Sequence, residues 1–257
     1  MISNKYQILD KLSSGSFGMV YKGINNRTNE PVAIKIIQKS DNIVFKNECL
    51  IYKALEKDKK FARLKWITTT EDYHVIVMSL LGSPIKDINF NNLNSDEIKL
   101  IAIHIFEKID TLHSYNIVHR DIKTNNFVMT DKDDLELFLI DFSFSTFTID
   151  EYGEEKLNVG INNIIGSIYF CSLNVHDRET PNKRDDLESA CYVINDLIQG
   201  NTWHNCKYEN NIISEKEKFI NNINLDWLYE IYSQIRQLDF NESININDLI
   251  LIIDKST

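Results

Sequence analysis

Hydrophobic and polar positions alternate along residues 6–37, in runs that turn-forming residues separate. A period of two places successive side chains on opposite faces of an extended chain, so each run predicts a β-strand. The predicted strands are 6–12, 19–24 and 31–37, and the breaks between them are S-S-G-S-F-G (13–18) and N-N-R-T-N-E (25–30). Because both breaks are short, the pattern predicts an antiparallel meander.

Helical spacing replaces this alternation in most of the remaining chain. The clearest case is 95–112, where apolar residues recur on one face and Asn94 with Glu97 forms a cap-like start. Helices are also expected at 41–57, 184–199 and 225–238, with strands at 73–78 and 135–140 and a last apolar segment at 244–253. A strand-rich beginning and a helix-rich remainder predict an α+β fold with two lobes, joined near residues 79–84.

Composition and charge exclude several classes of protein. The net charge of −10 argues against a general nucleic-acid surface. No apolar run approaches the roughly 20 residues of a membrane helix, and the first residues lack an apolar signal core. The four cysteines are scattered without a C-x-x-C pair, which favours free thiols over a metal or disulfide framework. We therefore expect a soluble intracellular protein, cytoplasmic or nuclear, without membrane or nucleic-acid partners.

A glycine-rich turn, S-S-G-S-F-G-M-V, contains Gly15 and Gly18. Glycines let backbone N–H groups approach phosphates closely, although many ordinary hairpin turns have the same composition. A dinucleotide-binding dehydrogenase would require a helix after this turn, whereas here a strand follows. A glycine hairpin that covers the phosphates of a nucleotide is the reading that fits the order of elements.

V-A-I-K (32–35) places Lys35 on the third predicted strand. By spacing alone, a strand lysine facing water is the commoner case, but the tetrapeptide matches a signature whose lysine bridges the α- and β-phosphates of ATP. Such a lysine needs a carboxylate partner. Glu48, in the next predicted helix, is a better candidate than Glu30 in a turn or Glu56 at a charged helix end.

I-V-H-R-D-I-K-T-N-N (117–126) follows the long predicted helix. Phosphoryl transfer needs a carboxylate that takes the proton of the acceptor hydroxyl, which we assign to Asp121, and an amide that holds magnesium, which we assign to Asn126. Lys123 can neutralise the transferring phosphoryl charge. Asp141, at the end of a predicted strand, is the second expected Mg²⁺ ligand. A charged surface loop would explain any one of these residues but not the set.

Taken in order, these motifs resemble those of eukaryotic-type protein kinases across nearly the whole chain. Finer features are similar to the casein kinase 1 family: the glycine loop, M-S-L-L-G (78–82), H-R-D-I-K-T-N-N-F, S-L-N (172–174) and K-R-D-D-L-E-S (183–189). The resemblance implies one bilobal protein kinase domain over 1–257, with an N-lobe at 1–78, a hinge at 79–84 and a C-lobe at 85–257. It also implies ATP and Mg²⁺ as cofactors and a protein substrate with a Ser or Thr acceptor. We expect a monomer.

Further residue roles follow from the resemblance alone. Met78 would be the gatekeeper and Leu81 a hinge contact to adenine, while Asp186 would brace the H-R-D backbone and Arg120 would have a positioning role. Lys35, Glu48, Asp121 and Lys123 would be the catalytic residues. The implied nucleotide contacts are Leu12, Gly15, Ser16, Phe17, Gly18, Val20, Ala33, Lys35, Met78 and Leu81.

Three departures from the family pattern bear on activity. Tyr169 occupies the position of an arginine that helps the family bind phosphorylated or acidic substrates, although Arg178, Lys183 and Arg184 leave anion recognition open. Ser13 replaces the first glycine of the loop, and Ser143 replaces the glycine after Asp141-Phe142. If position 143 needs a positive φ, serine there costs about 1–2 kcal/mol. A pseudokinase that binds nucleotide or partners without transfer is therefore the alternative to an active Ser/Thr kinase.

Overall fold

The computed structural model describes residues 4–88, 93–130 and 136–256. The chain divides into two compact units, Met1–Ser83 with Val128–Ser143 and Pro84–Phe127 with Phe144–Thr257. The first is rich in strands and the second is mainly helical, so the predicted α+β class is confirmed. Among the described residues, no helix has the length and apolar character needed to cross a bilayer.

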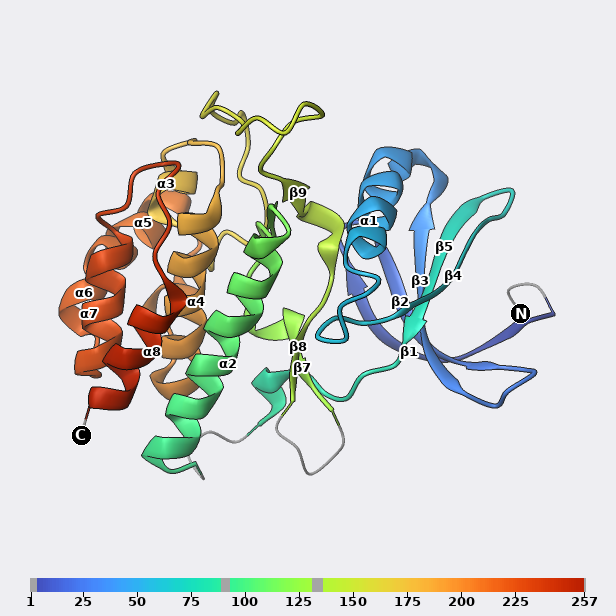
Figure 1. Cartoon of the computed structure of the whole chain (residues 1–257), viewed down its shortest axis with the longest axis horizontal. Helices are drawn as coiled ribbons and strands as arrows, with labels where there is room; N and C mark the ends of the chain where they lie inside the picture. The colour runs from blue at the N-terminus through green and yellow to red at the C-terminus, as the bar shows by residue number, and fades with distance from the viewer. Residues whose placement is uncertain (1–3, 89–92, 131–135, 257) are drawn as a thin grey trace. The chain divides into compact units, whose positions relative to one another are not determined.

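The first unit contains a five-stranded antiparallel sheet with the strand order β1-β2-β3-β5-β4 (Figure 1). Its elements are β1 (Tyr6–Gly15), β2 (Gly18–Asn25), β3 (Pro31–Gln38), α1 (Asn42–Ala54), β4 (Leu64–Thr69) and β5 (Tyr73–Ser79). The predicted meander and the strand at 73–78 are confirmed. β4 was not predicted, because a register shift between Leu64 and Trp66 interrupts the alternation at this sheet edge.

The two faces of this sheet have different partners because side chains alternate along each strand. One face forms an apolar cluster in which Val32, Ile34, Val75 and Val77 are almost completely buried. Burial of each such side chain contributes about 1.5–3 kcal/mol. The alternate residues of β3, including Lys35, lie on the face that α1 covers. The sheet therefore places a lysine in a buried position next to a helix.

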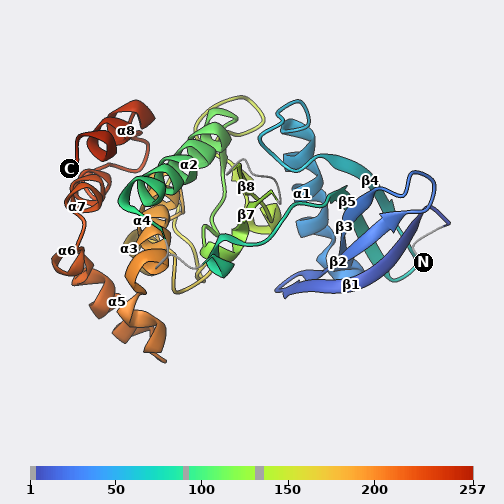
Figure 2. The same ribbon diagram turned by 90° about the horizontal axis from the view of Figure 1, so that it is seen from below.

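The second unit is built around α2 (Ser95–Ser114), α4 (Lys183–Gln199), α7 (Asp226–Ile235) and α8 (Ile246–Lys255), which pack against one another (Figures 1 and 2). The three helices predicted in this region, at 95–112, 184–199 and 225–238, are confirmed with small shifts in their ends, and the last apolar segment, 244–253, contains most of α8. Asn94 and Glu97 form a complete capping box, with bonds of 2.9 and 3.0 Å between each side chain and the other residue's N–H. Shorter helices were not predicted: α3 (Leu173–His176), α5 (Glu209–Glu217) and α6 (Phe219–Asn222).

The remaining elements are short strands and 3₁₀ helices, and several of them flank Asp121 and Asp141. The strands are β6 (Ile117–Val118), β7 (Phe127–Met129), β8 (Leu137–Leu139) and β9 (Thr146–Phe147). β8 lies within the strand predicted at 135–140, whose first residue is outside the described part of the chain. The 3₁₀ helices are η1 (Lys39–Asp41), η2 (Ile85–Asp87), η4 (Thr124–Asn126), η5 (Phe142–Phe144) and η6 (Thr202–Asn205).

An aromatic cluster fixes η6 in the second unit. The ring of Trp203 lies edge-on to Tyr192 of α4 and to Phe219 of α6, with centroids 5.2 and 5.5 Å apart. Edge-to-face pairs at such distances contribute about 0.5–1.5 kcal/mol beyond their buried area. The cluster leaves the indole N–H of Trp203 available to a partner outside the apolar core.

Candidate active site

Lys35 is at the centre of a buried polar cluster in the first unit. Its Nζ lies 2.7 and 2.8 Å from the two carboxylate oxygens of Glu48 and 2.8 Å from Oδ1 of Asp141. Lys35 is supplied by β3, Glu48 by α1 and Asp141 by the chain after β8. The expected pairing with Glu48 is present, while Glu30 pairs with Lys65 instead.

The charge state of Lys35 follows from the balance of burial and ion pairing. Burial alone would lower the pKa of Lys35, but the nearby Asp141 and Glu48 carboxylates outweigh it and raise the pKa above its ordinary value. The ammonium is therefore charged at neutral pH. A fixed positive charge with three directed N–H groups can bind either carboxylate or phosphate oxygens.

Ser143 belongs to the same cluster, a role that the sequence did not indicate. Its hydroxyl oxygen accepts a hydrogen bond from Lys35 Nζ at 2.6 Å and lies 2.7 Å from Oδ1 of Asp141, to which the hydroxyl donates. The backbone at residue 143 does not have the positive φ considered in the sequence analysis. A positive φ occurs instead at Asp141, where it is 68°. Serine at position 143 therefore carries no strain from a positive φ, and its hydroxyl is an additional hydrogen-bond acceptor for Lys35.

The predicted nucleotide contacts belong to the glycine turn, one sheet face and the chain after β5. Gly15 and Gly18 are paired across the turn that Ser16 and Phe17 form. Gly18 has a structural reason to lack a side chain, since a Cβ there would lie 2.2 Å from the carbonyl oxygen of Ile36, whereas Gly15 has open space at that place. Open space beside a backbone N–H is what a bound phosphate requires.

The register of the paired strands determines where the other predicted nucleotide contacts lie. Val20 is opposite Lys35, and Ala33 is opposite Met78, so these four share one face of the sheet. Tyr52 of α1 donates a hydrogen bond to the sulfur of Met78 at 3.3 Å. Leu12 is half exposed on β1, and Leu81 follows β5 in a partly buried position.

The loop that carries Asp121 lies in the second unit. Lys123 Nζ approaches Oδ2 of Asp121 at 2.5 Å, and Asn126 Nδ2 donates to the backbone carbonyl of Asp121 at 2.8 Å and to Oδ2 at 3.3 Å. Oδ1 of Asp121 is buried and has no hydrogen-bond partner among the described residues. One carboxylate oxygen is thus fixed in place, and the other is left without a donor.

Asp186 of α4 holds the backbone of this loop, as expected. Its carboxylate accepts hydrogen bonds from the backbone N–H of His119 at 2.7 Å and of Arg120 at 2.9 Å. Burial opposes ionisation of Asp186, but hydrogen bonds from His113 and from His119 outweigh it and hold the pKa of Asp186 below its ordinary value. This support stabilises Arg120 in a left-handed conformation with φ of 64°. The sequence did not indicate His113.

Residues 166–172, the segment that contains Tyr169, contact the same loop. A Cβ on Gly166 would lie 2.1 Å from the carbonyl oxygen of Arg120 and 3.3 Å from Cα of Asp121. The position can therefore hold only glycine without displacing the loop. Tyr169 packs edge-on to His204, with ring centroids 5.3 Å apart.

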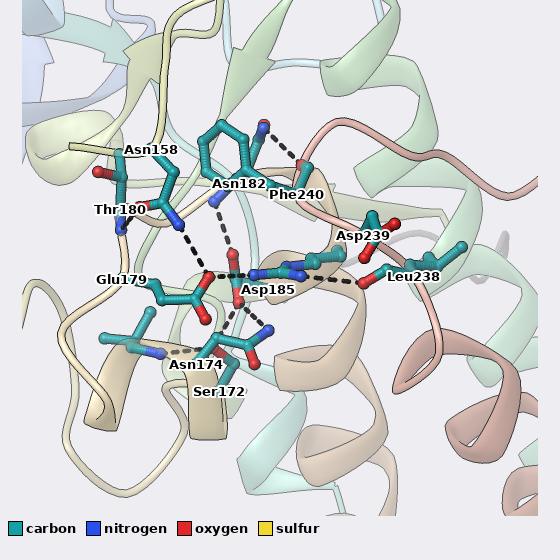
Figure 3. Close-up of polar contacts among 12 residues, drawn as sticks. Asn158, Ser172, Asn174, Glu179, Thr180, Asn182, Asp185, Leu238, Asp239 and Phe240 are labelled. Carbon is teal, nitrogen blue, oxygen red and sulfur yellow. Dashed lines mark hydrogen bonds and ion pairs between the residues drawn. The ribbon is translucent and has the colours of Figure 1, made fainter. Parts of the chain in front are cut away.

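The C-terminal end of this segment is tied to α4 by Asp185 (Figure 3). Ser172 Oγ donates to Oδ1 of Asp185 at 2.6 Å, and the backbone N–H of Asn182 donates to Oδ2 at 2.7 Å. Asn174 also donates to Oδ1, at 3.2 Å. One carboxylate thus joins the N-terminal caps of α3 and α4.

Two of the basic residues near this segment are engaged within the protein. Arg178 donates to both carboxylate oxygens of Glu209, at 2.9 and 3.0 Å. Arg184 donates to the carbonyl oxygen of Leu238 at 2.9 Å and pairs with Glu179. Each arginine thus already has a carboxylate partner, which offsets part of the positive charge available to a substrate anion.

The residues present fit a hard cation and a polyphosphate. Both contacts of Asn126 to Asp121 use its amide nitrogen, so its oxygen is the atom that would face a cation. Asp141 supplies a carboxylate whose side chain is 35% exposed. Carboxylate, amide and phosphate oxygens are the ligands that Mg²⁺ prefers. The described residues contain no cluster of three or more His, Cys, Asp or Glu that could hold a metal without such a phosphate.

Comparison with known protein families gives an independent result. Residues 6–251 match the family model described as the protein kinase domain. The match begins at the first residue of β1 and ends within α8.

Proposed function

Because the chain belongs to the protein kinase family, we propose that it is an active serine/threonine kinase of the casein kinase 1 type, which transfers the γ-phosphate of ATP to a protein. The observation that carries this proposal is the unpartnered Oδ1 of Asp121. A buried carboxylate oxygen without a donor costs free energy, and such atoms are retained where a ligand supplies the donor. The hydroxyl of a serine or threonine is a donor of this kind.

In the proposed reaction, Asp121 orients the acceptor hydroxyl through Oδ1 and takes its proton. The hydroxyl oxygen forms a bond to the γ-phosphorus as the bond to the β-phosphate oxygen breaks, which leaves ADP and a phosphorylated protein. Lys123 lies against Oδ2 of Asp121. We assign to the Lys123 ammonium the role of neutralising negative charge on the oxygens of the transferring phosphoryl group.

We assign the nucleotide phosphates to Lys35 and the glycine turn, and Mg²⁺ to Asn126 and Asp141. A bound Mg²⁺ would neutralise the charge of the phosphate oxygens. Within the first unit, Glu48 holds the ammonium of Lys35 so that it is ordered before a nucleotide binds. Leu12, Ser16, Phe17, Val20, Ala33, Met78 and Leu81 complete the proposed nucleotide contacts.

The choice of serine and threonine rests on the sequence around the loop. Lys123, two residues after Asp121, resembles the pattern of kinases that act on these acceptors rather than on tyrosine. The K-R-D-D-L-E-S heptad at 183–189 and S-L-N at 172–174 support the casein kinase 1 type.

The test is transfer of label from γ-labelled ATP to casein, with Mg²⁺, by purified wild-type protein and the Asp121→Asn variant. Loss of the base should lower kcat by about 10²–10⁴-fold. ATP-dependent thermal stabilisation should persist, because Asp121 belongs to the acceptor side of the reaction. Asp141→Asn should reduce both transfer and the Mg²⁺-dependent part of ATP binding. Asp248→Asn, an exposed residue of α8, is the matched control.

Full activity in Asp121→Asn would contradict the assigned base. ATP-dependent stabilisation of the wild type without label on casein or on the protein itself would favour the pseudokinase alternative.

A further inference from the structure

A lysine that the proposed reaction does not use is completely buried in the second unit. Lys216, near the end of α5, has no exposed surface. Its Nζ lies 2.6 Å from the carbonyl oxygen of Cys171, 3.0 Å from that of Ile168 and 3.1 Å from Nε2 of His176. An ammonium group has three N–H donors, and here each has an acceptor.

The neighbouring histidine is arranged to accept from this lysine. His176 Nδ1 lies 3.1 Å from Oε1 of Glu209, so the proton of a neutral imidazole belongs on Nδ1 and Nε2 is left to accept. Burial, together with the positive charge of Lys216, lowers the pKa of His176. Burial also lowers the pKa of Lys216 to about 8, and the surrounding Cys171, Glu188 and Glu209 oppose this. Lys216 also lies over the ring of Tyr192, 5.0 Å from its centroid.

Cys171, His176 and Glu209 form a line that resembles a nucleophile, a base and an orienting carboxylate. The thiol sulfur is 3.5 Å from Nε2 of His176. Burial raises the pKa of the Cys171 thiol to about 11, and Nε2 of His176 is already occupied by Lys216. A protonated, buried thiol beside an occupied base is not a nucleophile. The cluster is therefore structural rather than a second catalytic centre.

The cluster formed by Lys216, Cys171, His176 and Glu209 holds the segment 166–172 in place. This segment has no strand partner, so its carbonyl groups need other donors. Lys216 satisfies the carbonyls of Ile168 and Cys171, and the indole N–H of Trp203 satisfies that of Tyr169 at 2.8 Å. Two side chains that follow far along the sequence thus determine the course of these residues.

The other end of the segment is in contact with the catalytic loop. Gly166 packs directly against the backbone of Arg120 and Asp121, as its missing Cβ requires. When the hydroxyl of an acceptor protein reaches Oδ1 of Asp121, the acceptor residues on either side of that hydroxyl must lie against the nearby surface of the kinase. Residues 167–169 are partly exposed and form part of that surface. Displacement of the segment would therefore change how an acceptor protein binds.

We propose that Lys216 is a positioning residue for the acceptor protein, which fixes the 166–172 segment beside Asp121 by binding the carbonyls of Ile168 and Cys171. The expected effect on acceptor binding rests on the proposed kinase function. The anchoring of the segment by Lys216 is a property of the second unit alone. Lys216 is neither one of the proposed nucleotide contacts nor one of the assigned Mg²⁺ ligands.

The test compares Lys216→Met with Lys218→Met, since Lys218 is an exposed lysine two residues later whose contact is a surface pair with Glu215. In Lys216→Met, KM for casein should rise by about tenfold while KM for ATP stays at the wild-type value, because misplacement affects only the acceptor. Hydrogen exchange of the Phe170 and Cys171 amides, which donate to the carbonyl of Ser167, should accelerate by about tenfold. Lys218→Met should match the wild type in every measurement.

Unchanged casein KM and unchanged exchange in Lys216→Met would overturn the proposal, and so would an equal rise in KM for ATP and for casein. If Lys216→Met does not fold, Lys216→Leu, which also has no N–H donor, decides in its place by the same measurements. The exchange experiment requires no catalysis. If the wild type transfers no phosphate, the proposed function fails, while the exchange rates still report whether Lys216 anchors the segment.

Discussion

Nζ of Lys35 lies 2.8 Å from Oδ1 of Asp141, although 106 residues separate the two in sequence. The same ammonium contacts Glu48 and Ser143, so four residues from three parts of the chain form one network, of which only Asp141 is partly exposed. Buried networks of this kind are stable only while every member has its partner. The consequences for this protein can be tested by removing one member at a time.

Loss of the Lys35 ammonium should cost far more stability than loss of a surface lysine. Lys35→Met leaves Glu48, which is completely buried, without its cation, and we expect the free energy of unfolding to fall by about 3 kcal/mol. Lys65→Met removes a comparable but more exposed pair with Glu30 and should cost less than about 1 kcal/mol. Urea unfolding of both variants measures the difference. Equal losses would mean that burial does not set the strength of the Lys35 pair.

Ser143 should contribute to both stability and nucleotide binding. Ser143→Ala removes the hydroxyl that accepts from Lys35 and donates to Asp141, and we expect a loss of about 2 kcal/mol in unfolding free energy. KM for ATP should rise several-fold because Lys35 and Asp141 lose a common partner.

Ser143→Gly is the informative companion to the alanine variant. It removes the same hydroxyl and adds backbone freedom, so its stability should lie about 0.5–1 kcal/mol below that of Ser143→Ala. An alanine variant equal to the wild type, with a loss only in the glycine variant, would show that the hydroxyl is unimportant.

Two glycines with similar backbone angles should respond very differently to alanine. Gly153 and Gly166 have φ of 85° and 83°, so alanine is strained at both positions by about 1–2 kcal/mol. Only at Gly166 would the new Cβ collide, 2.1 Å from the carbonyl of Arg120. Gly166→Ala should therefore also lower kcat, by about 100-fold, while Gly153→Ala keeps it. Thermal unfolding and casein kinetics distinguish the two, and a similar kcat in both variants would contradict the close contact.

Asp185 should make stability depend on pH in the acidic range. Burial, against hydrogen bonds from Ser172 and Asn182, raises the pKa of Asp185 from 3.8 to about 6. The folded protein therefore binds more protons than the unfolded chain between these values. The contribution of this group to stability is full below pH 4, about the unfolded pKa, and is lost as the pH rises through about 6.

The measurement for Asp185 is the slope of unfolding free energy against pH between about 4 and 6. Asp185→Asn cannot titrate, so its slope should differ from that of the wild type by up to about 3 kcal/mol over the interval. Asp248→Asn, an exposed residue, serves as the control. Parallel curves for Asp185→Asn and the wild type would show that Asp185 does not titrate in this range.

Local sequence determined much of this protein. Alternation predicted β1, β2, β3 and β5, and helical spacing with the Asn94–Glu97 box predicted α2, because these signals act between residues close in the chain. The order of the motifs around Lys35, Asp121 and Asp141 predicted the protein kinase family, which the family match then supported. Such motifs are visible because one stretch of backbone must carry several chemical groups at fixed spacing.

Tertiary structure alone decided the rest. Lys216 and Lys218 are two residues apart in the charged run S-E-K-E-K, yet one is completely buried and the other is exposed. Nothing local distinguishes them, since burial depends on carbonyl groups that lie more than 40 residues earlier in the chain. In the sequence, Ser143 was only a replacement for the glycine of the family pattern. The structure shows that its hydroxyl accepts a hydrogen bond from Lys35, a contact that also depends on residues far apart in the chain. Long-range packing determines which polar groups lose water, and the loss of water gives those groups their structural roles.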